Sequence, residues 1–417
     1  MTEILYRSIT IMQIILFSYG MYLLCIGVFG LRTKTCSVDY LPKNKFAILI
    51  PAHNEENVIG NLIRNLNQLD YPHHLFDIYV IADNCTDNTA EIANSLGAIV
   101  LNRFNNFKKG KGFALDWALE KLKLNKTDSN EINNYDAVVI FDADNLVSGN
   151  FLKVMNNKLV SGENIIQSYI DSKNPNDSWI TASFSIMFWL NNRFALMSRY
   201  NLGLCGLLAG TGMCISTQVL KEVGWATSTL TEDLEYSMKA LLHNYKTTYA
   251  HEAKIYDEKP LSFLASSRQR LRWARGQIDV TIKYLPLMFY RAIKERNFIK
   301  LESSLRMCQL FMIIIAGIIL LLGIFKADLI TTTSVYYYLN GKFPLVAIFL
   351  LYIPYALPIL LLSLDSLPLG PFKYLIFFPI FAYSWYLIYF YAFFTFKNTT
   401  WMPTKHSRAL DIEQLET

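Results

Sequence analysis

The sequence predicts an α/β domain with a mostly parallel sheet, set between hydrophobic segments that can cross a membrane. In the middle of the chain, short apolar runs alternate with longer amphipathic runs, which is the pattern of strand–helix–strand units. Apolar residues also crowd the two ends of the chain. Only 18% of the 417 residues are charged, against about 25% in soluble domains. This composition excludes a disordered chain, a collagen-like chain and an ordinary soluble enzyme.

Four segments are apolar enough to form membrane helices. Residues 9–31 contain no charge and are long enough to cross a hydrocarbon core. A cleavable signal peptide is the alternative, but no small-x-small cleavage site precedes Arg32. Three further segments lie near the C-terminus, at residues 307–325, 343–363 and 372–396. Pro354 and Pro358 interrupt the second of these, so we expect it to be kinked or only partly inserted.

Basic residues flank the central domain on both sides. They are Arg32, Lys34, Lys43 and Lys45 before it and Lys283, Arg291, Lys294, Arg296, Lys300 and Arg306 after it. The positive-inside rule therefore predicts an integral membrane protein with a cytoplasmic central domain and an outside N-terminus. Three C-terminal crossings would put Lys397, Lys405 and Arg408 outside, so either the rule fails at the tail or one proline-rich segment does not cross. Basic residues at membrane boundaries favour lipid headgroups over nucleic acid as partners.

The predicted elements define the order of the chain. The division is a membrane helix at 9–31, an α/β domain at 45–280, an interfacial amphipathic segment at 281–306, about three hydrophobic segments at 307–396 and a tail at 397–417. Within the domain, strands are predicted at 47–50, 77–82, 98–101, 137–141 and 165–169, and helices at 55–69, 86–96 and 112–124. Ligands of parallel sheets bind beyond the carboxyl ends of the strands. The polar residues that close each strand are therefore the candidate site.

Several of these closing residues are acidic. The first strand is followed by Pro51, Ala52, His53 and Glu55, the second by Asp83, and the fourth by Asp142 and Asp144. A helix cap is an equally good interpretation of Glu55 or Asp83 alone. Asp142 and Asp144 differ, because two carboxylates one residue apart at the end of a buried strand need a cation. Hard oxygen ligands suit Mg²⁺ or Mn²⁺ that bridges to phosphate oxygens.

Polar groups also gather in two later helical segments. Glu232 and Asp233 open the first of them, where helix capping is the alternative role. Gln269, Arg272 and Trp273 fall at i, i+3 and i+4 of the second, on one helical face. Such a face suits a pyrophosphate and a sugar ring, and a basic helix on the membrane surface is the alternative.

A basic, glycine-containing run lies earlier, at residues 108–112. It resembles a fragment of a phosphate-binding loop but lacks the complete pattern. Lys111 in this run is a candidate nucleotide ligand, with a solvated loop as the alternative.

Together these motifs resemble the membrane-embedded family 2 glycosyltransferases of the GT-A fold, in the group of cellulose, hyaluronan, chitin and poly-N-acetylglucosamine synthases. The matching motifs, in the family's order, are Pro51-Ala52-His53-Asn54-Glu55, Asp83, Asp142-Ala143-Asp144, Thr231-Glu232-Asp233 and Gln269-Arg270-Leu271-Arg272-Trp273. The resemblance implies that Asp83 and the loop 51–55 hold the uridine of a UDP-sugar, and that Lys111 approaches the nucleotide. Asp142 and Asp144 would hold the diphosphate through Mg²⁺ or Mn²⁺, with Asp144 as the direct ligand.

The resemblance also assigns the acceptor side. Asp233 would be the general base, while Glu232, Gln269, Arg272 and Trp273 would line the acceptor site and brace the leaving diphosphate. One base without a second, nucleophilic carboxylate implies a single inverting displacement, in which an α-linked donor gives a β-linked product.

Three functions remain open at this point. The leading hypothesis is a synthase that polymerises a UDP-sugar and passes the polysaccharide through its own membrane segments, with a partner subunit or a homo-oligomer able to supply further helices. The main alternative transfers a single sugar to a membrane lipid. A non-catalytic membrane scaffold is the third, and the intact Asp144 and Asp233 argue against it.

Overall fold

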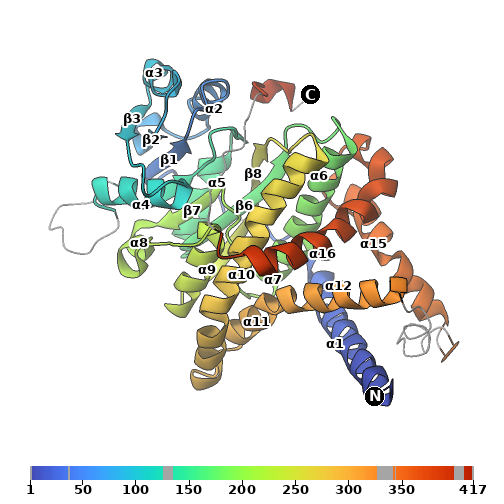
Figure 1. The fold of residues 1–417 in the computed structure, drawn as a ribbon. Coiled ribbons are helices and arrows are strands. Elements are labelled where there is room, and N and C mark those ends of the chain that lie inside the picture. Colours follow the sequence, from blue (N-terminus) through green and yellow to red (C-terminus); the bar gives the residue numbers. More distant parts are fainter. Residues whose placement is uncertain are drawn as a thin grey trace.

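The computed structural model describes residues 2–35, 38–124, 135–325, 341–342, 344–398 and 408–415. An α/β domain fills the upper left of Figure 1, and helices α1 and α12 extend from it at the lower right. The predicted architecture is thus present.

The domain is built on one sheet of eight strands, with the order β3-β2-β1-β4-β7-β6-β8-β5. The strands are β1 (Phe46–Ala52), β2 (Phe76–Asp83), β3 (Ile99–Arg103), β4 (Ala137–Ile140), β5 (Leu146–Val147), β6 (Ile165–Ser172), β7 (Met213–Ser216) and β8 (Thr247–Asp257). The first four pair in parallel, as do β6 and β8, whereas β7 is antiparallel to both of its neighbours and β5 is antiparallel to β8. The predicted mostly parallel sheet is confirmed.

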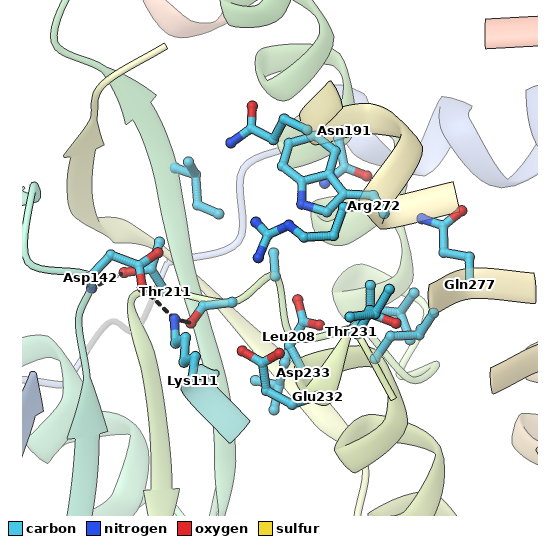
Figure 2. Close-up of a pocket in the computed structure, with 18 of the residues that line it drawn as sticks. Lys111, Asp142, Asn191, Leu208, Thr211, Thr231, Glu232, Asp233, Arg272 and Gln277 are labelled. Carbon is cyan, nitrogen blue, oxygen red and sulfur yellow. Dashed lines mark hydrogen bonds and ion pairs between the residues drawn. The ribbon is translucent and has the colours of Figure 1, made fainter. Parts of the chain in front are cut away.

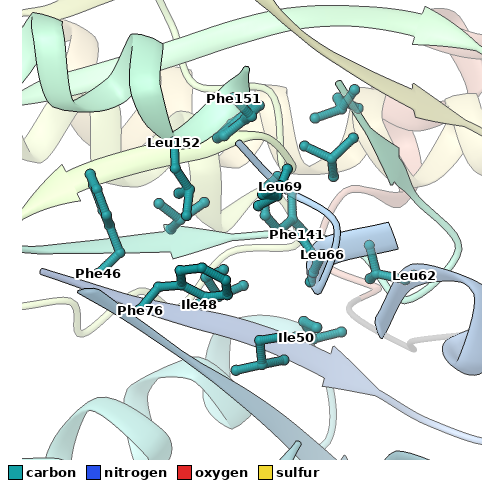
Figure 3. Packing of buried hydrophobic residues seen from close by; sticks show 14 of the residues in the cluster. Phe46, Ile48, Ile50, Leu62, Leu66, Leu69, Phe76, Phe141, Phe151 and Leu152 are labelled. Atoms are coloured by element: carbon teal, nitrogen blue, oxygen red, sulfur yellow. The ribbon is translucent and has the colours of Figure 1, made fainter. Parts of the chain in front are cut away.

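Helices cover both faces of this sheet. They are α2 (Ile59–Leu66), α3 (Thr89–Ser95), α4 (Lys111–Lys121), α5 (Phe151–Val160), α8 (Thr217–Val223) and α9 (Glu232–Leu242). Phe46, Ile48 and Ile50 of β1 pack with α2 and α5 (Figure 3), and Ala47 and Leu49 pack on the other face with α4, α8 and α9. A strand that is covered on both faces is apolar throughout, which explains the uninterrupted run in β1.

Most of the remaining chain is helical. It forms α1 (Thr2–Val28), α6 (Trp179–Asn191), a π-helical segment η3 (Asn192–Met197), α7 (Ser198–Asn201), α10 (Phe263–Lys294), α11 (Phe298–Met307), α12 (Gln309–Phe325), α15 (Pro344–Asp365) and α16 (Phe378–Thr395). Short 3₁₀ segments are η1 (Phe29–Leu31), η2 (His73–Leu75), η4 (Gly370–Phe377) and η5 (Ile412–Gln414). Helix α10 runs without a break across residue 280, so the predicted domain edge lies inside a continuous helix.

Within the described residues, three helical stretches are long and apolar enough to cross a membrane: Glu3–Leu31, Phe298–Gly323 and Gly370–Thr395. They contain or overlap three of the four predicted segments. The fourth, at 343–363, falls on α15, whose part Tyr355–Asp365 is a shorter apolar helix; residue 343 itself lies outside the described residues.

The C-terminal tail packs against the α/β domain. Asn61 donates its side-chain amide to Asp411 over 2.9 Å, and the backbone N–H of Arg408 donates to Glu258 over 3.1 Å. Arg408 also forms an ion pair with Asp177. The described part of the tail is therefore in direct contact with the domain. The number of C-terminal crossings stays a prediction from sequence; Lys405 lies outside the described residues.

Candidate active site

One cavity of about 720 Å³ is lined by every residue that the sequence predicts for the site. These residues are Pro51, Ala52, His53, Glu55, Asp83, Lys111, Asp142, Asp144, Glu232, Asp233, Gln269, Arg272 and Trp273. In Figure 2 Asp142 and Lys111 lie on one side of the cavity and Gln277 on the other, with Asp233 and Arg272 between them. We call the part around β1, β2 and β4 the sheet end.

At the sheet end, two turns leave the parallel strands in left-handed backbone conformations. Asn54 after β1 has φ 57° and Asn84 after β2 has φ 52°, and asparagine tolerates this conformation better than most residues. His53 donates its Nδ1–H to the carbonyl of Asp83 over 2.7 Å, which ties the two turns together. The loop 51–55 and Asp83 therefore form one rigid edge of the cavity.

Asp83 is paired with an arginine that sequence reasoning missed. Arg103 closes β3, is buried, and donates Nη1–H to Asp83 over 2.5 Å. Burial raises the pKa of Asp83, while hydrogen bonding and charge from Arg103 oppose that rise. The parallel pairing of β2 with β3 sets Asp83 opposite Arg103. The signal was a basic residue closing a strand, which could have been read from the predicted strand order.

Lys111 reaches across the sheet end to the Asp142 carboxylate. Its ammonium pairs with Asp142 and donates to the carbonyl of Gly210 over 2.6 Å. Burial disfavours the charged form of Lys111, but the charges of Asp142, Glu232 and Asp233 outweigh it and raise the pKa of Lys111. Lys111 thus opens α4 with a mostly buried side chain, and its role as a nucleotide ligand stays a prediction.

Asp144 accepts two hydrogen bonds from neutral donors. The backbone N–H of Glu258 donates to it over 3.2 Å and the Asn145 amide over 3.4 Å. Nearby, Asp257 pairs with the buried Lys259 over 2.5 Å. Burial raises the pKa of Asp257 to about 6, and Asp144 and Asp142 add to the rise. Asp257 and Glu258 line the same cavity and were not predicted.

This donor set fits a divalent cation that shares its ligands with a substrate. Asp142 and Asp144 offer hard carboxylate oxygens at one edge of the cavity, with further acidic groups beside them. Within the described ranges no three His, Cys, Asp or Glu side chains converge as a ready-made metal site. Mg²⁺ and Mn²⁺ bind in this way, through one or two carboxylates completed by phosphate oxygens and water.

Asp233 lies in the first turn of α9, between the sheet end and α10. Burial, reinforced by the charge of Glu232, raises the pKa of Asp233 to about 7, while backbone N–H groups and Lys111 hold it from rising further. A carboxyl group with a pKa near neutrality is suited to general-base catalysis. Gly210, with φ +86°, lies against it, since a Cβ there would come 3.6 Å from Asp233 Oδ2.

Helix α10 approaches α9 closely because of a glycine. A Cβ on Gly276 would lie 2.6 Å from the Thr231 side chain and 2.9 Å from its backbone nitrogen. Gly276 therefore lets α10 pack directly on the N-terminus of α9. Gln269, Arg272 and Trp273 line the cavity as one face of α10, which is the arrangement that their i, i+3, i+4 spacing predicted. Arg270 of the same motif donates instead to Ser384 over 2.7 Å and anchors α16.

The cavity continues from α10 between the membrane-proximal helices. We call this part the membrane end; it is lined by Gln277 and Thr281 of α10, Ser303 and Arg306 of α11, Gln309, Leu310 and Ile313 of α12, and Trp385, Tyr386 and Tyr389 of α16. None of these residues was predicted. They come from helices that are distant in sequence, and none of these residues is part of a motif that the sequence analysis identified.

The sequence of the α/β domain decides the family. A model of the family described as "Glycosyltransferase like family 2" matches residues 42–276, which is more than half of the chain. The chain belongs to this family. The predicted membership is confirmed, and the fold of this glycosyltransferase is the GT-A fold.

Curated relatives of this glycosyltransferase include a glycolipid synthase and a polysaccharide synthase. The probable glycosyltransferase YdaM of Bacillus subtilis is 25% identical over 308 residues, covering 71% of this chain and 68% of that protein. The beta-monoglucosyldiacylglycerol synthase of a Nostoc species is 27% identical over 264 residues, or 60% of this chain and 53% of that protein. The poly-beta-1,6-N-acetyl-D-glucosamine synthase of Staphylococcus epidermidis is 24% identical over 245 residues, or 57% and 55%. The chain thus spans about half the length of the last two.

Among solved structures, the mannosyltransferase PcManGT from Pyrobaculum calidifontis resembles most of the chain. The TM-score is 0.56 at 15% identity, and the match covers 87% of this chain and 98% of that one. That structure is a complex with GDP-Man and Mn²⁺. At this identity the likeness establishes the fold alone.

Proposed function

We propose that this glycosyltransferase moves a sugar from a UDP-sugar to a hydroxyl group of an acceptor that enters from the bilayer, by a metal-dependent, inverting displacement. The observation that carries the proposal is the continuous cavity, which joins the carboxylates of the sheet end to Asp233 and then to the membrane helices. The basic flanks of the domain support a cytoplasmic position for it.

The sheet end is the donor site in this proposal. Asp83 and the loop 51–55 hold the uridine, with Arg103 fixing the orientation of the Asp83 carboxylate. Asp142 and Asp144 hold the cation, which when bound neutralises charge on the diphosphate. Lys111 exchanges its contact with Asp142 for the diphosphate oxygens, which are the stronger anionic partner.

Asp233 and α10 carry the displacement. The acceptor hydroxyl oxygen forms a bond to the anomeric carbon as the bond from that carbon to the diphosphate breaks, so the configuration inverts. Asp233 accepts the hydroxyl proton, and UDP leaves with the bonding electron pair. Arg272 places a cation near the departing diphosphate, while Gln269 and Trp273 orient the acceptor.

A membrane lipid is the acceptor that the geometry favours over the leading hypothesis from sequence. The membrane end lies among helices of two candidate spans, so a lipid headgroup can enter it sideways. A growing β-linked polysaccharide is the second candidate. It is supported by the aromatic side chains of Trp273, Trp385 and Tyr389, since flat aromatic rings suit sugar rings.

The test uses purified protein in nanodiscs with Mn²⁺ or Mg²⁺ and a panel of UDP-sugars. UDP release with a short, lipid-extractable product is expected. Release with a long polymer would establish the polysaccharide synthase instead. If no UDP-sugar gives release above the Asp233→Asn variant, the proposed reaction is wrong.

A further inference from the structure

The membrane end of the cavity contains one charged group. Arg306 lies in the last turn of α11, inside the candidate span Phe298–Gly323. Among the described residues that α11, α12 and α16 contribute to the cavity wall, it is the only one with a charge. A charged side chain within a membrane segment is costly and commonly marks a functional site.

Within the described residues, no carboxylate forms a direct ion pair with Arg306, although the charge of Glu302 acts on it from one turn away. The one hydrogen bond of Arg306 to the described part of the chain runs to the carbonyl of Cys205 over 3.5 Å, and no carboxylate there lies within 4.0 Å of it. The nearest acidic residue along α11 is Glu302, one turn earlier.

Glu302 contacts other partners through Oε1, while its buried Oε2 accepts no hydrogen bond within the described residues. Arg199 donates to it from Nε over 3.0 Å and approaches it with Nη2 at 2.9 Å, and the Tyr22 hydroxyl donates over 2.6 Å. Arg199 and Glu302 cancel in charge and are both buried. The group of three therefore retains the single positive charge of Arg306, which faces the cavity.

We propose that Arg306 binds the phosphate of an anionic lipid, and that this lipid is the sugar acceptor. A guanidinium matches phosphate geometry with two parallel hydrogen bonds. The donor's own diphosphate is already matched by the sheet end, so the charge at the membrane end requires a second anion. The proposal rests on the proposed function, in which Asp233 is a general base and the acceptor therefore carries a free hydroxyl.

Both requirements together define a substrate class. The acceptor is a phospholipid whose headgroup carries a phosphodiester and at least one hydroxyl, as phosphatidylglycerol does. Ser303, Thr281 and Gln309 offer polar contacts to such a headgroup, while Leu310 and Ile313 face its apolar part. A neutral diacylglycerol would leave Arg306 unpaired in the cavity.

The experiment compares wild type with Arg306→Gln, Arg306→Lys and Arg291→Gln. Arg291→Gln is the matched control, because it also removes one arginine charge, but from the exposed end of α10. There Arg291 pairs with Glu295 at 3.0 Å. Lipid binding is measured without donor, by native mass spectrometry in neutral detergent with phosphatidylglycerol or diacylglycerol. We expect Arg306→Gln to weaken phosphatidylglycerol binding about tenfold. The affinity of Arg306→Lys should lie between those of wild type and Arg306→Gln, and that of Arg291→Gln should stay within about twofold of wild type.

The same variants are then assayed for UDP release and lipid product. We expect the KM for phosphatidylglycerol to rise about tenfold in Arg306→Gln, with the KM for the UDP-sugar unchanged. Equal binding of both lipids by wild type, or equal binding of phosphatidylglycerol by wild type and Arg306→Gln, would overturn the proposal. Full displacement of the lipid by inorganic phosphate at equal concentration would overturn its assignment as a lipid site.

The binding arm separates the two proposals. Selective phosphatidylglycerol binding without UDP release from any donor would support the anionic site and overturn the proposed function. If Arg306→Gln turns over the lipid as wild type does, the proposed function is supported and the anionic lipid site is overturned. The melting temperature and UDP affinity of each variant show whether it is folded. If Arg306→Gln does not fold, Arg306→Lys, which keeps the charge but loses the guanidinium, provides the comparison.

Discussion

The two ends of the cavity differ in how they handle charge. The sheet end concentrates acidic groups such as Asp83, Asp142 and Asp144 and balances them with Arg103 and Lys111. The membrane end is lined by apolar, aromatic and amide side chains around one cation. A dense, internally paired site is suited to a small, highly charged ligand whose position must be fixed. A sparse site is suited to an acceptor that is mostly apolar and must enter and leave.

The largest effect is expected at Asp233, where the two ends meet. Asp233→Asn should lower the transfer rate by about 10³-fold or more, because general-base catalysis typically contributes about 10²- to 10⁴-fold. UDP binding, measured by calorimetry, should stay within about twofold. Retained turnover would refute the assignment of the base.

The sheet end can be tested separately through its cation. Asp144→Ala should remove metal-dependent UDP binding, with an affinity loss of about tenfold or more, since Asp144 is one of the two predicted metal ligands and the diphosphate depends on the cation. Asp70→Ala, an exposed carboxylate on the same domain, is the control. If UDP affinity in Asp144→Ala equals that of wild type both with and without Mn²⁺, Asp144 is not a ligand.

The pH profile follows from the same environment. Because burial raises the pKa of Asp233 to about 7, the base is protonated at lower pH. The transfer rate should fall about tenfold per pH unit below pH 6.

The folding stability depends on pH with the opposite sign: lower pH favours the folded state, although it slows transfer. A carboxyl with a raised folded-state pKa stabilises the fold when protonated, and this contribution is lost as pH rises through 7. The melting temperature of wild type should therefore drop relative to Asp233→Asn between pH 6 and pH 8, and a constant difference would contradict the shift.

The contact between α9 and α10 links the two ends. Gly276→Ala places a Cβ 2.6 Å from Thr231 and forces α10 away from Asp233. We expect a loss of about 1–3 kcal/mol in unfolding free energy and a lower kcat with little change in UDP affinity. Gly149→Ala is the matched control, because nothing lies within 4 Å of its Cβ position. Equal kcat in the two variants would show that α10 tolerates the displacement.

The sheet end could be predicted from sequence, and the membrane end could not. Parallel strands bring their carboxyl ends to one edge, so Asp83 and Asp142 are close wherever the sheet forms. The face made by Gln269, Arg272 and Trp273 follows from helical spacing alone. Arg306, Gln309 and Tyr389 meet only because α10, α11, α12 and α16 pack together, and packing between apolar helices leaves no short-range pattern. The tail contact at Arg408 is polar, but it joins Arg408 to Asp177 and Glu258, which are distant in sequence and share no motif with it.

The smallest effect is expected at that tail contact. Arg408 pairs with Asp177 at the partly exposed surface, and its backbone N–H donates to Glu258, whose own N–H holds Asp144. An exposed ion pair contributes about 0–1 kcal/mol, and Arg408→Ala keeps the backbone hydrogen bond. Its UDP affinity and kcat should therefore stay within about twofold of wild type. A deletion of residues 408–417 removes the backbone contact as well, so a change in Mn²⁺ dependence only in the deletion would mean that the tail helps to position Asp144 through Glu258. If Arg408→Ala alone reproduces that change, the ion pair couples the tail to the sheet end, and the sheet end is less self-contained than its internal charge pairing implies.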